Sequence, residues 1–283
     1  MNKNVLTFLG CDADYADAEI VLFGVPFDGT ASFRPGSRFG PAAIRADSFG
    51  IETYSPYADR DLSELRVCDA GDLSLPFGFA EKMLDVTKQR IDAILADNKR
   101  PFMLGGEHLV TLGAVRALVQ RYPDLHVLHL DAHTDLREDY LGETLSHATV
   151  IRRVWEMLGD GRIHQFGIRS GEKAEFSFAE AHTDMHRFTL SGFKDALKTL
   201  EGKPVYLTLD LDVLDPAYLP GTGTPEPGGV TFTELLAAVL QLHTVQLVGC
   251  DVVELSPHYD VSGVSNAVAC KIVREILLQM KGA

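Results

Sequence analysis

Short apolar runs recur along the chain, and each ends near glycine, proline or aspartate. The runs cover residues 19–26, 101–106, 126–133, 162–170, 204–212 and 245–255. Because they are continuous rather than alternating, they predict strands of a parallel sheet that is buried on both faces. Apolar side chains recur at helical spacing in residues 79–97, 110–122, 231–243 and 264–280. This order of elements predicts a three-layer α/β/α fold with a mainly parallel sheet.

The length of 283 residues suits one large α/β domain or two small ones. No linker, internal repeat or low-complexity stretch interrupts the pattern, so we expect residues 1–283 to form a single domain. Parallel sheets bind ligands at the carboxyl ends of their strands, where the loops gather. The acidic and histidine-rich clusters of this chain all fall there.

Composition and net charge exclude some classes of binding partner. Apolar residues make up 46% of the chain and charged residues 23%, which is typical of a globular protein with a large core. The net charge of −14 argues against nucleic acid or an anionic membrane as partner. The N-terminal apolar stretch is too short for a secretory signal, and no window is long enough to span a membrane. The four cysteines lack CxxC spacing and predict reduced core residues, so we expect a cytoplasmic protein.

Acidic and imidazole side chains replace leucine and valine at the ends of two runs. Asp131, His133 and Asp135 follow one run, and Asp210 and Asp212 end another. Because strand side chains alternate between faces, residues two apart are expected to point the same way. Neighbouring carboxylates repel each other unless a cation lies between them. Each pattern therefore favours a metal site.

His108 adds a third element, at a glycine-rich turn between a strand and a helix. A single histidine there is often structural, and aspartate at a strand end often caps a helix or, like Asp215 before Pro216, forms a turn. The three elements together give four carboxylates and two imidazoles, too much negative charge for one zinc ion. Such donors favour two adjacent divalent ions, Mn²⁺ before Mg²⁺, Fe²⁺, Co²⁺ or Ni²⁺.

The motifs GGEH (105–108), DAHTD (131–135) and DLDVLDP (210–216) resemble the three metal motifs of the ureohydrolase (arginase/agmatinase) family. Segments 24–45, 221–229 and 251–260 resemble the agmatinase branch more than arginase itself. The resemblance extends over nearly the whole chain. It implies an arginase-like fold and two Mn²⁺ per chain. One ion would be held by His108, Asp131, Asp135 and Asp210, and the other by His133, Asp131, Asp210 and Asp212, with Asp131 and Asp210 as bridges.

The resemblance also implies catalytic residues. His147 matches the proton-shuttle histidine of the family, although Ala148 stands where glycine is usual. Glu254 matches the acid that binds the guanidinium, and Asp135 would pass a proton to the leaving amine. A salt bridge between Glu254 and an internal arginine is the structural alternative.

The implied activity is hydrolysis of a small cationic guanidino substrate, foremost agmatine, to urea and an amine. Family members are usually trimers or hexamers, so a homo-oligomer is expected. Three alternatives stay open: a sister ureohydrolase acting on guanidinobutyrate or arginine, a single-zinc amide deacetylase on the related scaffold, and a non-catalytic metal-binding protein. A single-zinc site would not need His108 and Asp135.

Overall fold

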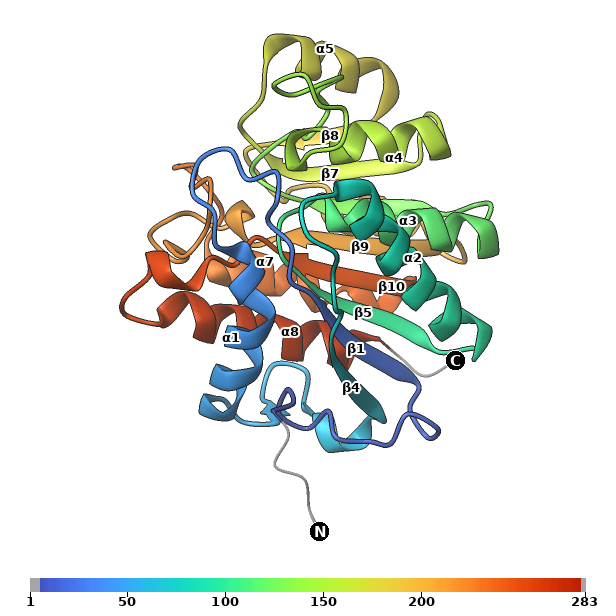
Figure 1. Ribbon diagram of the computed structural model, residues 1–283, viewed down its shortest axis with the longest axis vertical. Coiled ribbons are helices and arrows are strands. Elements are labelled where there is room, and N and C mark those ends of the chain that lie inside the picture. The colour runs from blue at the N-terminus through green and yellow to red at the C-terminus, as the bar shows by residue number, and fades with distance from the viewer. Residues whose placement is uncertain (1–5, 281–283) are drawn as a thin grey trace.

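The computed structural model describes residues 6–280, so residues 1–5 of the N-terminal stretch and residues 281–283 lie outside the described part. Eight parallel strands form the main sheet, in the order β4-β1-β5-β10-β9-β6-β7-β8, running from bottom to top in Figure 1. The strands are β1 (Ile20–Val25), β4 (Val67–Asp72), β5 (Arg100–Gly105), β6 (His126–Leu130), β7 (Ile163–Ile168), β8 (Asp184–Arg187), β9 (Pro204–Asp210) and β10 (Gln246–Val253). A separate antiparallel pair joins β2 (Tyr54–Ser55) and β3 (Arg60–Asp61). The predicted mainly parallel sheet is confirmed.

Helices cover both faces of this sheet. One face packs against α2 (Ala80–Ala96), α3 (Val110–Arg121), α4 (Val150–Leu158) and α5 (Lys173–His182). The other packs against α1 (Gly40–Asp47), α6 (Phe193–Thr199), α7 (Phe232–Val239) and α8 (Val264–Gln279). Strand side chains alternate between the two cores: Tyr206 of β9 joins the first, while Val205 and Leu207 join the second. Burial on both faces explains why the strands are continuous apolar runs.

The four central strands deliver their carboxyl ends to one place. β5, β10, β9 and β6 are neighbours, and the chain leaves them at Gly105, Val253, Asp210 and Leu130. The turn after β5 lies directly on its neighbours, since a side chain at Gly106 would meet the Phe27 carbonyl oxygen at 1.9 Å. Within residues 6–280, no helix has the length and apolar character needed to cross a bilayer.

Candidate metal centre

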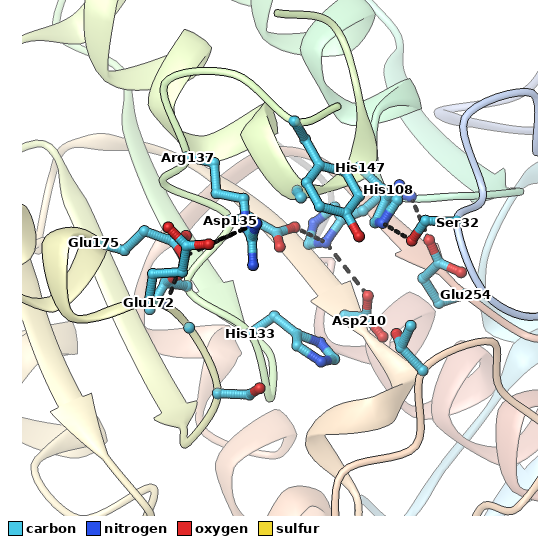
Figure 2. A pocket seen from close by; sticks show the side chains of 16 residues that line it. Ser32, His108, His133, Asp135, Arg137, His147, Glu172, Glu175, Asp210 and Glu254 are labelled. Carbon is cyan, nitrogen blue, oxygen red and sulfur yellow. Dashed lines mark hydrogen bonds and ion pairs between the residues drawn. The ribbon is translucent and has the colours of Figure 1, made fainter. Parts of the chain in front are cut away.

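A cavity of about 280 Å³ opens at the carboxyl ends of the central strands. Figure 2 shows His108, His133, Asp135 and Asp210 lining it, with Glu254 on one side and Glu172 on the other. The sequence motifs GGEH, DAHTD and DLDVLDP therefore meet in space, as predicted.

The first group of donors surrounds the imidazole of His108. Its Nε2 lies 2.8 Å from the hydroxyl of Thr208, so Nδ1 faces the cavity. This Nδ1 is buried and makes no hydrogen bond to any described residue. Carboxylate oxygens of Asp131, Asp135 and Asp210 nevertheless lie 3.0, 3.2 and 3.3 Å from it. Four donors converging on one point without hydrogen-bond geometry fit the ligands of a cation.

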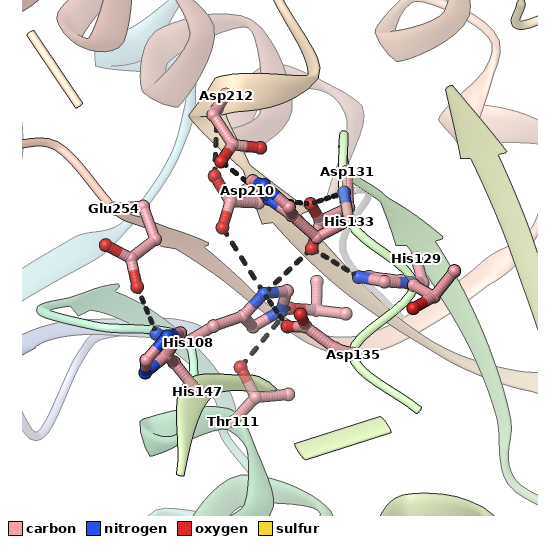
Figure 3. A network of polar contacts seen from close by, with 12 residues as sticks. His108, Thr111, His129, Asp131, His133, Asp135, His147, Asp210, Asp212 and Glu254 are labelled. Atoms are coloured by element: carbon pink, nitrogen blue, oxygen red, sulfur yellow. Dashed lines mark hydrogen bonds and ion pairs between the residues drawn. The ribbon is translucent and has the colours of Figure 1, made fainter. Parts of the chain in front are cut away.

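A second group adjoins the first through Asp131 (Figure 3). His133 Nδ1 lies 3.0 Å from Asp212 Oδ2 and 3.5 Å from Asp131 Oδ1. The other oxygen of Asp131, Oδ2, is the one that faces His108. One carboxylate thus contributes an oxygen to each group. All donors are carboxylate oxygens or imidazole nitrogens, a set that suits two neighbouring divalent ions of the harder kind.

The electrostatics of the site call for cations. Burial, followed by repulsion from Asp212 and Asp131, raises the pKa of Asp210 well above its usual range. Burial, followed by repulsion from Glu107, does the same to the pKa of Glu254. Divalent ions and a cationic substrate would remove this penalty, because positive charge stabilises the ionised carboxylates.

The local backbone differs from the expected strand alternation. β6 ends at Leu130 and β9 at Asp210, so Asp212 and the ligands after Leu130 lie beyond the strands. Residues 211–213 form a 3₁₀ turn, which the Asp210 carboxylate caps by accepting the Asp212 N–H at 2.8 Å. Asp135 has a left-handed backbone, with φ of 53°. The expectation that alternation aligns these ligands was wrong, because a 3₁₀ turn and an irregular loop after the strands bring them together instead.

Asp135 keeps this unusual conformation because its neighbours are anchored. Its carbonyl accepts the N–H groups of Ile151 and Arg152 at 3.0 and 3.1 Å, at the start of α4. The residues on either side, Thr134 and Leu136, both donate to the buried carboxylate of Glu175. Such strain persists only where the surroundings hold it, and it is common at functional sites.

His147 lies at the rim of the same cavity, in a 3₁₀ turn spanning His147–Thr149. Its Nδ1 is 3.4 Å from the Thr30 hydroxyl and its Nε2 is 3.3 Å from the Ser32 hydroxyl. Burial, more than any nearby charge, lowers the pKa of His147. This direction favours the neutral form of a ring that lines the cavity.

Glu254 follows β10 directly and also has a left-handed backbone, with φ of 66°. Its N–H donates to the Gly106 carbonyl at 2.9 Å. Its Oε1 accepts the backbone N–H of His108 at 2.8 Å. The partner of this oxygen is therefore a backbone amide and not the arginine of the salt-bridge alternative. The side chain lines the cavity, as a substrate-binding acid must.

Sequence reasoning missed several residues of the site. Segment 24–45 received no site residue, yet Ser32 lines the cavity and Thr30 contacts His147. Thr30 also donates to the buried Glu107, at 2.5 Å. His129 was hidden inside an apolar strand, and its position two residues before Asp131 was the available signal.

The expectation that Asp215 lies in a turn is confirmed. Asp215 is a turn residue whose carboxylate accepts the N–H groups of Ala217, Gly228 and Gly229. The same loop reaches the site through Thr224, whose hydroxyl lies 3.4 Å from Asp212 Oδ2.

The chain has extensive similarity to known proteins. The sequence profile of the Arginase family matches residues 18–279. An agmatinase from Bacillus anthracis is 48% identical over 275 residues, covering 96% of this chain and 95% of the relative. A guanidinobutyrase from Pseudomonas aeruginosa is 33% identical, covering 96% of this chain and 88% of the relative. The crystal structure of the agmatine ureohydrolase of Thermoplasma volcanium matches with a TM-score of 0.88 and 34% identity, over 98% of this chain and 95% of that one.

Proposed function

The chain belongs to the arginase family, and from that premise we propose that it is a two-manganese ureohydrolase that cleaves agmatine to putrescine and urea. The observation that carries the proposal is the buried pair of donor groups joined by Asp131 beside Glu254. The two groups supply ligands for adjacent ions, and Glu254 supplies an acid for a guanidinium.

The proposed ligands follow the two donor groups. One ion would be held by His108, Asp131, Asp135 and Asp210, and the other by His133, Asp131, Asp210 and Asp212. Asp131 would serve both because its two oxygens face different histidines. Manganese is the proposed metal because oxygen donors dominate and imidazole completes the set.

The chemistry must overcome a poor electrophile, since a guanidinium is stabilised by resonance. Two divalent ions, when bound, supply the nucleophile by lowering the pKa of a shared water. Glu254 would accept two charge-assisted hydrogen bonds from the guanidinium and hold its carbon in position for attack. Addition of water must be followed by cleavage of a C–N bond, and the amine leaves only when protonated. Asp135 would deliver that proton, while His147 exchanges protons with solvent.

Charge in the cavity favours agmatine among guanidino compounds. Beyond the four aspartates that two divalent ions would balance, the lining carries Glu172, Glu175 and Glu254 against Arg137, an excess of two negative charges. Agmatine carries a guanidinium at one end and an ammonium at the other. Guanidinobutyrate carries a carboxylate in place of the ammonium, and arginine adds one. Glu172 and Glu254 lie on opposite sides of the cavity, which suits a substrate with a cation at each end (Figure 2).

Urea release from a panel of guanidino compounds tests the proposal. The Mn²⁺-loaded protein should release urea from agmatine with a kcat/KM at least about tenfold above that for guanidinobutyrate or arginine, a difference of about 1.4 kcal/mol. If guanidinobutyrate were the best substrate, the protein would be a guanidinobutyrate ureohydrolase instead. Absence of urea from every compound would refute the proposed hydrolysis. The expected trimer or hexamer stays a prediction for solution measurements.

A single-zinc deacetylase is disfavoured by the donor set. His108 and Asp135 are dispensable in such a site, yet His108 Nδ1 and Asp135 Oδ2 approach within 3.2 Å in the buried first group. Metal analysis separates the alternatives directly, because a single-zinc enzyme binds one ion per chain.

A further inference from the structure

His129 is a buried histidine on β6, two residues before Asp131. Its Nε2 lies 2.7 Å from Asp131 Oδ2. With His108, Asp131 and Asp135 it forms a set of donor atoms that all lie within 4.8 Å of one another. By distance alone His129 is a candidate metal ligand, so the tautomer that its hydrogen bonds impose decides its role.

Gln165 on β7 fixes that tautomer. Its Nε2 lies 2.9 Å from the Thr134 carbonyl oxygen, which only accepts hydrogen bonds, so this end of the amide is the NH₂ group. Its Oε1 lies 3.0 Å from the Thr183 hydroxyl, which can donate to it. The amide NH₂ is therefore the group that lies 3.0 Å from His129 Nδ1. His129 Nδ1 must accept this hydrogen bond, and the proton of the neutral ring is on Nε2.

A protonated Nε2 cannot bind a metal, because it has no free electron pair. It donates instead to Asp131 Oδ2, the oxygen that lies 3.0 Å from His108 Nδ1. The second oxygen, Oδ1, accepts the backbone N–H of His133 at 2.6 Å. Each oxygen of Asp131 thus accepts one hydrogen bond from a fixed N–H group. Each keeps a lone pair that could bind one ion, on the side of His108 for Oδ2 and of His133 for Oδ1.

We propose that His129 is a positioning residue that orients the bridging carboxylate of Asp131 without binding a metal, and that Gln165 holds it in the required tautomer. The inference rests on the proposed two-metal function. Donors behind a metal ligand fix its rotamer, and their loss typically weakens metal binding about 10- to 100-fold.

Calorimetric titration of the metal-free protein with Mn²⁺ tests the proposal without using activity. His129→Phe keeps a ring but loses the donor, and it should weaken binding of both ions about 10- to 100-fold. His129→Gln places an amide NH₂ near the position of Nε2, and it should bind both ions within about threefold of the wild type. His126→Phe, at the other end of the same strand, is the control for replacing a buried histidine.

Two results would overturn the proposal. One is unchanged Mn²⁺ binding in a folded His129→Phe protein. The other is binding by His129→Gln as weak as by His129→Phe, as expected if His129 were itself a ligand. Thermal melts of the metal-free proteins verify folding, and His129→Met replaces the phenylalanine variant if that one does not fold. Failure of the proposed function would look different, because the wild type itself would then bind fewer than two Mn²⁺.

Discussion

The backbone N–H of His108 donates to Oε1 of Glu254 across 2.8 Å. This bond joins the turn after β5 to the end of β10, the strand beside it in the sheet. It uses only the backbone of the proposed metal ligand and only one oxygen of the proposed substrate-binding acid. A direct hydrogen bond therefore connects the proposed metal centre to the proposed guanidinium site. A substitution of Glu254 reports on the guanidinium site alone only if it keeps this hydrogen bond.

Bridging by Asp131 and Asp210 makes a prediction about metal content. Asp131→Asn and Asp210→Asn should lose both manganese ions on dialysis, because each side chain would contact both. Asp212→Asn should lose mainly one, since Asp212 lies only in the group of His133. Elemental analysis per chain measures this, and a chelator should abolish urea release until Mn²⁺ is restored. Equal metal loss in the three variants would contradict the bridging assignment.

Arg169 makes a second prediction, on stability. Its guanidinium is half-buried and donates to backbone carbonyls of Asp212, Val213, Leu214 and Glu226. Arg169→Met removes these hydrogen bonds and should lower the free energy of unfolding by on the order of 3 kcal/mol. Because the Asp212 carbonyl is among these acceptors, the ion near His133 and Asp212 should also bind more weakly than the ion near His108.

Denaturant unfolding of the metal-free protein and Mn²⁺ titration measure the two effects of that variant. Arg187→Met, which removes an exposed arginine paired with Glu180, is the matched control. Stability of Arg169→Met equal to that of the control would show that the carbonyl contacts are dispensable.

Glu172 is predicted to set substrate choice. Its carboxylate lines the cavity and pairs with Arg137 at 2.9 Å. Glu172→Gln should raise KM for agmatine by up to about fivefold, the loss of at most about 1 kcal/mol from an exposed ion pair with the ammonium. KM for guanidinobutyrate should stay unchanged or fall. Steady-state urea release measures both, with Glu180→Gln on the helix that follows as control, and equal changes for the two substrates would refute the assignment.

His126 should make the fold sensitive to acid. Burial, together with the cations Lys203 and Arg162, lowers its pKa from 6.5 to about 4. The unfolded chain then takes up this proton more readily than the native protein. The free energy of unfolding is therefore unaffected by this group above the unfolded pKa of 6.5 and falls as the pH drops from there to the folded value of about 4, by on the order of 2 kcal/mol near pH 4.5.

The pH test compares wild type with His126→Asn, both metal-free so that metal release plays no part. The variant should lose less of its free energy of unfolding between about pH 7.5 and about pH 4.5 than wild type does. His243→Asn, which changes an exposed histidine, should behave like wild type. A parallel pH dependence in all three proteins would exclude His126 as the cause.

The sheet was predictable because its inner strands are buried on both faces. The residues of β5, β9 and β10 are nearly all apolar, and continuous apolar runs of this length are typical of strands covered by helices on both sides. The edge strands β4 and β8 are absent from the predicted runs because they read VCDAGD and DMHR, without a long apolar run. An edge strand pairs on one side only and does not need continuous apolar residues.

The ligand types were predictable, but the way in which they converge was not. Asp131, His133 and Asp135 were visible as polar residues after an apolar run. Their alignment depends on a left-handed residue and on anchoring by Glu175, which lies 40 positions from Asp135 in the chain. Such contacts between distant segments leave no periodic signal. The same reason hid Thr30 beside His147.

The final prediction separates substrate binding from the metal centre. Glu254→Gln keeps an oxygen that can accept the His108 N–H, so the turn after β5 and both manganese ions should remain. The change removes the negative charge that would pair with the guanidinium. The expected loss in kcat/KM is about 30- to 1000-fold, or about 2–4 kcal/mol of transition-state stabilisation.

Three measurements on Glu254→Gln distinguish this role from a structural one. Metal content and melting temperature should match wild type, while urea release falls. Glu201→Gln, at an exposed position, provides the control. Glu254→Leu should in addition weaken Mn²⁺ binding, because the His108 N–H then loses its buried acceptor. Near-normal kinetics with a lowered melting temperature in Glu254→Gln would show that the acid supports the fold rather than the substrate.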